Sequence, residues 1–219
     1  MFWIITISLT GLYFLDRYQV KDKINRYKSD IISIETQLFA NDIIMEKINN
    51  ARIASESGYK VLTFDFRGYG KSTGTKDTRM NRDLEAAVAY MRAKGAKEII
   101  LIGASMGGTA VIELALEAQV QGVVALSPPM AFGRIDALEA VKSMIIPLLL
   151  IVAENDRPYY SDARELENAA AATQFLSLPG QQHGTNLFIE HRNEVFANLL
   201  AFLDRWTDDS LLAGVQTES

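Results

Sequence analysis

The sequence contains no cysteine among its 219 residues, which excludes disulfide bonds, a thiolate nucleophile and cysteine-ligated zinc. It is also poor in histidine, so a reaction that needs an imidazole must use His183 or His191. The formal net charge is -5, and no cluster of basic residues is interleaved with aromatic ones. We therefore expect no nucleic-acid partner and no general attraction to anionic lipid.

The segment from Met1 to Leu15 is strongly apolar and allows three interpretations. It is short for a transmembrane helix, which needs about 18 apolar residues. It lacks the positive start and the small-residue cleavage site of a secretion signal. Arg17, Lys21 and Lys23 follow it, as they would follow a short membrane anchor on a cytoplasmic body. We favour a buried strand or helix in a cytoplasmic protein, with membrane contact through this segment as the alternative.

Short apolar runs alternate with amphipathic stretches along the rest of the chain. Strands are expected at 31–34, 59–66, 98–102, 122–126, 147–153 and 174–178. Helices are expected at 42–57, 83–94, 106–118, 136–143, 161–171 and 188–206. Ser161 is the expected N-cap of its helix. This alternation predicts an α/β fold with a mostly parallel sheet covered by helices on both faces, whose functional groups lie at the carboxyl ends of the strands.

The sequence Gly-Ala-Ser-Met-Gly-Gly at 103–108 lies between an expected strand and an expected helix. A serine on such a turn projects its hydroxyl from the sheet edge, and the flanking glycines avoid clashes within the turn. The helix start behind it offers free N–H groups to an oxyanion. The Gly-x-Ser-x-Gly pattern can arise by chance, but its position between a strand and a helix favours Ser105 as a nucleophile.

A serine hydroxyl needs a base to remove its proton, and the base needs a carboxylate to orient it. His183 lies in a loop after the last expected strand, between glycines. His191 lies among charged residues, as a solvated surface histidine would. Asp156 follows the strand at 147–153 and is the favoured acid, with Glu154 as its rival. The alternative for both acids is a structural role, in turn formation or helix capping.

Gly-Lys-Ser at 70–72 is similar to the end of a phosphate-binding loop. That motif requires a glycine five places before Gly70, where this chain has Asp65. The segment therefore does not predict nucleotide binding.

The residues at 58–72, the turn at 103–108, Asp156 and the loop at 180–184 together resemble α/β-hydrolases. The resemblance covers about residues 31–206 and is closest to small, lidless bacterial esterases related to dienelactone hydrolases and serine aminopeptidase-like hydrolases. It implies a nucleophile elbow at Ser105, an acid at Asp156 and a base in the 180–184 loop.

The same resemblance implies a second oxyanion donor after the first strand of the family. It places Gln37 where relatives have a histidine, and it makes the Leu38 N–H the partner of the Met106 N–H in the oxyanion hole. Relatives usually begin with two or more antiparallel strands, which residues 1–30 do not clearly show.

About twenty residues separate Leu126 from Pro147, too few for a lid domain. We expect an open, shallow site, with Met130 and Phe132 as substrate-binding residues beside Met106 and Leu38. Core packing is an equal explanation for each of these side chains. An open apolar site suits small or short-chain acyl groups.

These observations predict an apolar segment at 1–29, a hydrolase domain at 30–207 and a polar tail at 208–219. The expected activity is hydrolysis of a small carboxylic ester, or of a thioester or amide, through a catalytic triad of Ser105, Asp156 and His183. No cofactor or metal is required by this chemistry. The alternative is a hydrolase-fold protein that binds a ligand or partner, at a membrane for example, without turnover. The sequence does not indicate an oligomeric state.

Overall fold

The computed structural model describes residues 2–8, 11–16, 59–64, 66–68, 72–74 and 80–206. The expected strand at 31–34, the expected helix at 42–57 and the loop with Gln37 and Leu38 lie outside the described residues. The proposed domain boundaries at residues 29 and 207 also lie outside them and stay predictions.

In the described part of the chain, seven strands form one sheet, in the order β2-β1-β4-β5-β8-β9 with β3 beside β1. All of them run parallel except β2, which is antiparallel to β1. This confirms the predicted, mostly parallel sheet. The strands are β1 (Phe2–Ser8), β2 (Gly11–Asp16), β3 (Lys60–Leu62), β4 (Glu98–Ala104), β5 (Gly122–Leu126), β8 (Leu148–Ala153) and β9 (Thr173–Leu178).

The apolar N-terminal segment supplies two of these strands. Trp3 of β1 pairs with Ile99 of β4 on one side and with Lys60 of β3 on the other. A continuous apolar run is typical of a strand in a mostly parallel sheet that helices cover on both faces. β1 and β2 form the antiparallel pair that the family resemblance implied and the sequence pattern did not show. No helix among the described residues combines the length and apolar character needed to cross a membrane.

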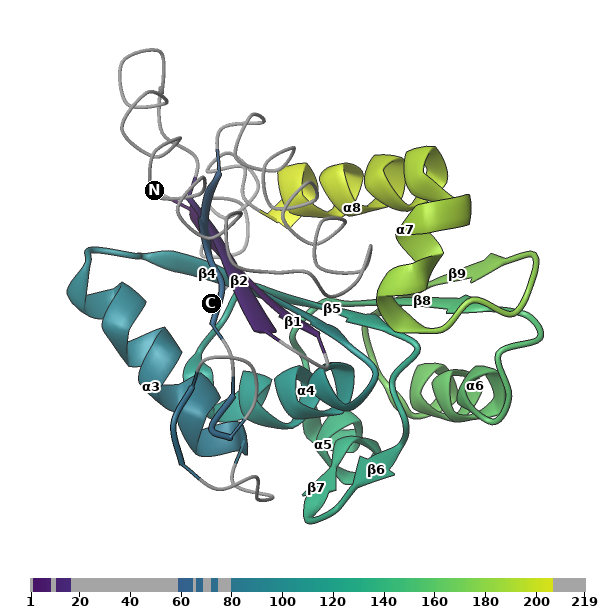
Figure 1. Ribbon diagram of the computed structural model, residues 1–219, viewed down its shortest axis with the longest axis horizontal. Helices are drawn as coiled ribbons and strands as arrows, with labels where there is room; N and C mark the ends of the chain where they lie inside the picture. Colours follow the sequence, from purple (N-terminus) through teal and green to yellow (C-terminus); the bar gives the residue numbers. More distant parts are fainter. Residues whose placement is uncertain are drawn as a thin grey trace, which may run out of the picture.

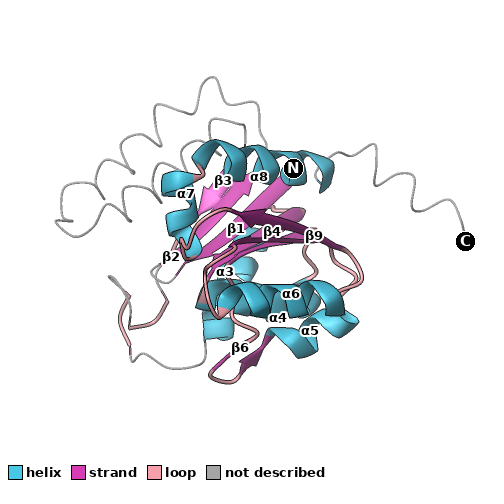
Figure 2. Ribbon diagram, turned by 90° about the vertical axis from the view of Figure 1, so that its right-hand side faces the viewer, coloured by secondary structure: helices cyan, strands magenta, loops and turns pink. Residues whose placement is uncertain are grey.

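Helices cover both faces of the sheet (Figures 1 and 2). One face carries α3 (Met80–Ala93), α4 (Met106–Ala118), α5 (Ala137–Ser143) and α6 (Tyr159–Ala169), and the other carries α7 (Leu187–Glu190) and α8 (Arg192–Trp206). Side chains of β4 alternate between the two layers, as the twofold period of a strand requires. Ile99 and Leu101 join the core beneath α3–α6, whereas Ile100 and Ile102 join the core beneath α7 and α8.

The strand expected at 59–66 is shorter in the structure. β3 pairs only with the first half of β1, because β2 takes the same edge of β1 from Thr6 to Ser8. The closing helix expected at 188–206 is divided at His191, whose N–H donates to Leu187 O and whose carbonyl accepts from Val195 N.

The predicted cap of the helix at 161–171 is wrong. α6 begins two residues earlier, with Pro158 at the N-cap, and the Ser161 hydroxyl donates to Pro158 O at 2.6 Å. Proline fits at this N-cap because an N–H at a helix start would have no acceptor within the helix. The sequence also missed a short hairpin of β6 (Ala131–Phe132) and β7 (Ile135–Asp136) between β5 and α5.

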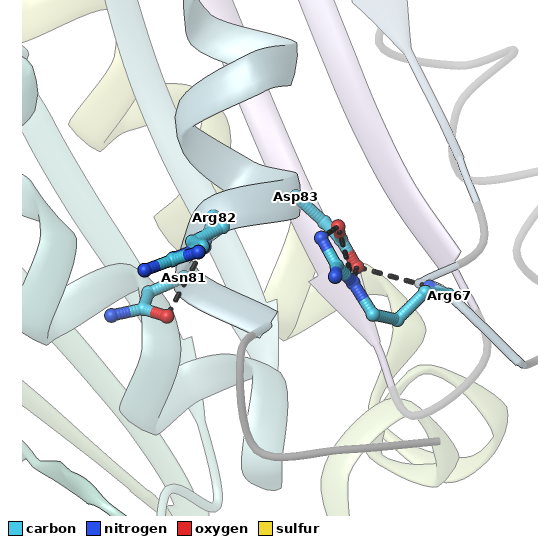
Figure 3. Close-up of polar contacts among 4 residues, drawn as sticks. All are labelled: Arg67, Asn81, Arg82 and Asp83. Carbon is cyan, nitrogen blue, oxygen red and sulfur yellow. Dashed lines mark hydrogen bonds and ion pairs between the residues drawn. The ribbon is translucent and has the colours of Figure 1, made fainter. Parts of the chain in front are cut away.

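An ion pair holds the loop after β3 against the start of α3 (Figure 3). The carboxylate of Asp83 accepts from the Arg67 backbone N–H at 3.0 Å and from its Nε at 2.8 Å. Both side chains are partly buried, and the guanidinium contacts the carboxylate through two nitrogens. Such a paired geometry fixes the loop more firmly than a single exposed contact.

Candidate active site

The turn at Ser105 is tightly constrained. Ser105 lies between β4 and α4 with φ 54° and ψ -128°, which is unfavourable for a residue with a side chain. Its N–H donates to Leu126 O at 2.8 Å. A Cβ at Gly103 would lie 2.2 Å from the Gly107 carbonyl oxygen, so this position accepts only glycine. The glycine in the sequence pattern therefore corresponds to a close approach of backbone at the turn that carries Ser105.

Three predicted side chains meet at the carboxyl edge of the sheet. His183 Nε2 lies 2.8 Å from Ser105 Oγ. His183 Nδ1 lies 2.9 Å from Asp156 Oδ2 and 3.2 Å from Oδ1. Ser105 and Asp156 are 6% and 5% exposed, whereas His183 is half-buried. The arrangement is a continuous hydrogen-bonded chain from a buried carboxylate, through an imidazole, to a hydroxyl.

The structure separates the favoured candidates from their rivals. Glu154 is exposed, and its N–H donates to Leu178 O, which places it at the strand end. His191 lies at the junction of α7 and α8. The favoured acid, Asp156, and the favoured base, His183, are hydrogen-bonded to each other.

Backbone hydrogen bonds join the loop of the acid to the loop of the histidine. Asn155 N donates to Gly180 O at 2.9 Å, and Asp156 N donates to Ala153 O at 3.1 Å. The Asp156 carbonyl in turn accepts from Tyr160 N in α6. The Asp156 carboxylate is thus held between the end of β8 and the first turn of a helix.

The start of α4 supplies the first predicted oxyanion donor. The N–H groups of Gly108 and Thr109 donate to Ser105 O, at 2.8 and 3.2 Å. The first N–H groups of a helix have no acceptor within it, which leaves those of Met106 and Gly107 for a ligand. The Met106 side chain is buried in the core beneath α3–α6. The second predicted donor, Leu38, lies outside the described residues and stays a prediction.

The two residues predicted to contact substrate differ in their surroundings. Met130 is half-buried and packs against the core beneath α3–α6, and its N–H donates to Asp162 Oδ2 at 3.2 Å. Phe132 lies in β6 and is 41% exposed. Core packing therefore explains Met130, whereas Phe132 has an exposed ring. Their contact with substrate stays a prediction.

Two residues beside the histidine were missed by the sequence reasoning. The ring of Tyr159 lies 4.1 Å from the His183 ring, centroid to centroid, at an interplanar angle of 41°. The hydroxyl of buried Ser127 accepts from Gly184 N at 3.0 Å. Ser127 directly follows β5, so the rule about carboxyl strand ends was the signal that could have found it. In the described part of the chain, no group of three or more acidic or histidine side chains is arranged to hold a metal.

Comparison with known proteins agrees with this fold. A family model for the alpha/beta hydrolase fold matches residues 39–203. The esterase domain of a Rhodothermus marinus protein is similar in structure, with a TM-score of 0.63 and 20% identity over 94% of this chain and 98% of that one. An esterase from Pyrococcus furiosus has a TM-score of 0.61 and 18% identity over 93% of this chain and 89% of its own.

A monoacylglycerol lipase from Paleococcus ferrophilus has a TM-score of 0.61 and 15% identity, over 93% of this chain and 94% of its own. At such identities these structures show a shared fold. No curated protein sequence matches the chain. Because the family model spans most of its length, this chain belongs to the α/β-hydrolase fold family.

Proposed function

We propose that the protein is a serine hydrolase that cleaves carboxylic esters through an acyl-enzyme on Ser105. The observation that carries the proposal is the hydrogen-bonded chain of Asp156, His183 and Ser105, with contacts of 2.9 and 2.8 Å. A serine hydroxyl is a weak nucleophile until a base takes its proton. This arrangement places a base on the hydroxyl and a buried carboxylate on the base.

The first half of the reaction forms the acyl-enzyme. His183 Nε2 accepts the hydroxyl proton while Ser105 Oγ attacks the ester carbonyl carbon, and Asp156 stabilises the imidazolium. The negative charge moves to the carbonyl oxygen. The N–H of Met106, with that of Leu38 as its predicted partner, donates hydrogen bonds to this oxyanion. One such donor is worth about a hundred- to a thousandfold in rate.

The second half restores the enzyme. The tetrahedral intermediate collapses, the bond to the leaving oxygen breaks, and His183 gives its proton to the departing alkoxide. Water then attacks the acyl group as His183 takes a proton from it, and the acid leaves as Ser105 recovers its proton. Thioesters and amides could follow the same steps. We propose esters as the substrate class because the structures that share this fold include esterases and a lipase.

A fluorophosphonate probe tests the proposal directly, because it reacts only with an activated serine. We expect labelling of the folded wild type and none of Ser105→Ala or His183→Gln. His191→Gln is the matched control, since it removes the other histidine, and it should label like the wild type. Folded wild type that resists the probe would overturn the proposal in favour of a binding protein without turnover.

The acyl group is tested with p-nitrophenyl esters from acetate to decanoate. Only the β6–β7 hairpin and α5 lie between β5 and β8, and Phe132 stays exposed on that hairpin. We therefore expect acetate and butyrate to give the largest kcat/KM. A maximum at decanoate would contradict the open site and leave the serine mechanism intact.

A further inference from the structure

Ser127 holds an unusual place in the fold. It directly follows β5, is fully buried, and has φ 47°, which disfavours any residue with a side chain. Its N–H donates to Ile151 O at 2.9 Å, at the end of the neighbouring strand. Its Oγ accepts from Gly184 N at 3.0 Å. Glycine would adopt this backbone without strain, so the hydroxyl is the feature that a serine adds here.

Between residues 81 and 206, only four polar residues are buried, and they lie at or beside the candidate site. They are Ser105, Thr109, Ser127 and Asp156. Two of them belong to the hydrogen-bonded chain through the histidine. The Thr109 hydroxyl donates to Pro129 O at 2.7 Å, and thereby holds the loop after β5 to the start of α4. Ser127, the fourth, binds the backbone of the histidine loop rather than the imidazole itself.

The bond from Ser127 ends on the residue that follows the base. Gly184 has φ 58°, and a Cβ there would lie 3.6 Å from Ala104 Cβ and 3.9 Å from Ser105 Cβ. The backbone after His183 therefore lies against the nucleophile elbow. A displacement of Gly184 would move the imidazole relative to the Ser105 hydroxyl.

Consecutive residues at the end of β5 thus bind the backbone of Ser105 and the backbone of the residue that follows His183. Leu126 O accepts from Ser105 N, and Ser127 Oγ accepts from Gly184 N. We infer that Ser127 is a positioning residue whose hydroxyl fixes the His183 loop at hydrogen-bonding distance from Ser105. The inference rests on the proposed function. A misplacement of about 1 Å at a reacting group can lower turnover about a hundredfold.

Two substitutions separate positioning from stability. Ser127→Ala and Ser127→Gly both remove the acceptor, but glycine also relieves the positive φ. The two variants should therefore differ in thermal stability and share the same catalytic defect. Ser143→Ala is the matched control, because Ser143 is exposed at the end of α5 and donates only to Ala140 O.

We would measure kcat and KM for p-nitrophenyl acetate, and the fluorophosphonate inactivation rate, at a temperature where every variant is folded. The expected result is a fall of about tenfold or more in kcat and in the inactivation rate for both Ser127 variants. KM should change by less than about twofold, because the acyl site is intact. Amide hydrogen exchange at Gly184 should become faster in both variants, and Ser143→Ala should match the wild type throughout.

Several results would overturn the inference. Unchanged kcat in Ser127→Gly would remove the positioning role, as would unchanged exchange at Gly184. A kcat that follows stability, lower in Ser127→Ala than in Ser127→Gly, would show a purely structural role. A wild type inert to the probe would instead remove the proposed function, and the positioning role with it.

Discussion

Replacing Gly103 by alanine should disable the candidate site without touching any of its functional side chains. The added Cβ would lie 2.2 Å from Gly107 O, 2.5 Å from Gly107 C and 2.7 Å from Gly108 N. All three atoms belong to the backbone at the start of α4. No side-chain rotation can relieve the contact, so β4 and the helix must separate.

The size of that movement sets the expected effect. The closest contact must widen by about 1 Å to reach even the tightest separation that Cβ atoms adopt. Ser105 lies between the two parts that must move, and its Oγ is 2.8 Å from His183 Nε2. A shift of this size breaks that hydrogen bond. We expect kcat/KM to fall at least about a hundredfold, with a loss of stability of about 1–3 kcal/mol.

Two other glycines calibrate the measurement. Gly95 has φ +90° and no atom within 4 Å of an added Cβ, so Gly95→Ala should lower stability through backbone strain and keep kcat/KM. Gly108→Ala should lower kcat/KM more than Gly95→Ala and less than Gly103→Ala. Its added Cβ has its closest contact with a side-chain atom, Pro128 Cβ, at 3.0 Å. The assay is ester hydrolysis beside urea unfolding for all three variants. Folded Gly103→Ala with wild-type turnover would refute the reasoning.

Other parts of the structure give further expectations. Asp83→Ala removes the carboxylate that binds the partly buried Arg67 guanidinium and its backbone N–H, and it should lower the free energy of unfolding by about 1–3 kcal/mol in urea. Glu167→Ala loses one surface ion pair and should lower it by about 0.5 kcal/mol or less. Burial raises the pKa of Glu113 above its ordinary 4.5, so the folded state holds this proton more tightly, and the resulting stability is lost as pH rises from 4.5 through the folded pKa. Glu113→Gln should therefore be more stable than wild type at pH 7 and should lose that advantage below pH 4 in urea titrations. Tyr159→Leu should lower kcat with little change in KM, while Tyr159→Phe keeps the ring beside His183 and the wild-type rate; equal rates in both would show that the ring contact is passive.

Much of the site could be predicted from the sequence because its residues follow the carboxyl ends of parallel strands. β4, β8 and β9 run parallel in one sheet, so residues that follow them must gather at the same edge. That rule brought Ser105, Asp156 and His183 together without any knowledge of side-chain packing. The helix Met106–Ala118 and the strand Gly122–Leu126 were also predicted to the residue.

Contacts between loops could not be predicted in the same way. The bond from Gly184 to Ser127 and the ring contact of Tyr159 depend on how separate loops pack, which no local pattern encodes. The short β3 had a similar cause, since its length depends on β2, an element distant in sequence that occupies the same edge of β1.

The choice between the two acids was open from the sequence alone, and it yields the sharpest functional test. Asp156 is 5% exposed with an oxygen 2.9 Å from His183 Nδ1, whereas Glu154 is exposed at the strand end. Asp156→Asn replaces the charge that stabilises the imidazolium, and it should lower kcat about 10³- to 10⁴-fold. Glu154→Gln is the matched change of acid to amide and should leave kcat within about twofold, because no desolvated charge is lost. A larger loss of kcat in Glu154→Gln than in Asp156→Asn would contradict this assignment. It would mean that the acid loop rearranges before turnover and that the hydrogen bond between Asp156 and His183 is not the one used in catalysis.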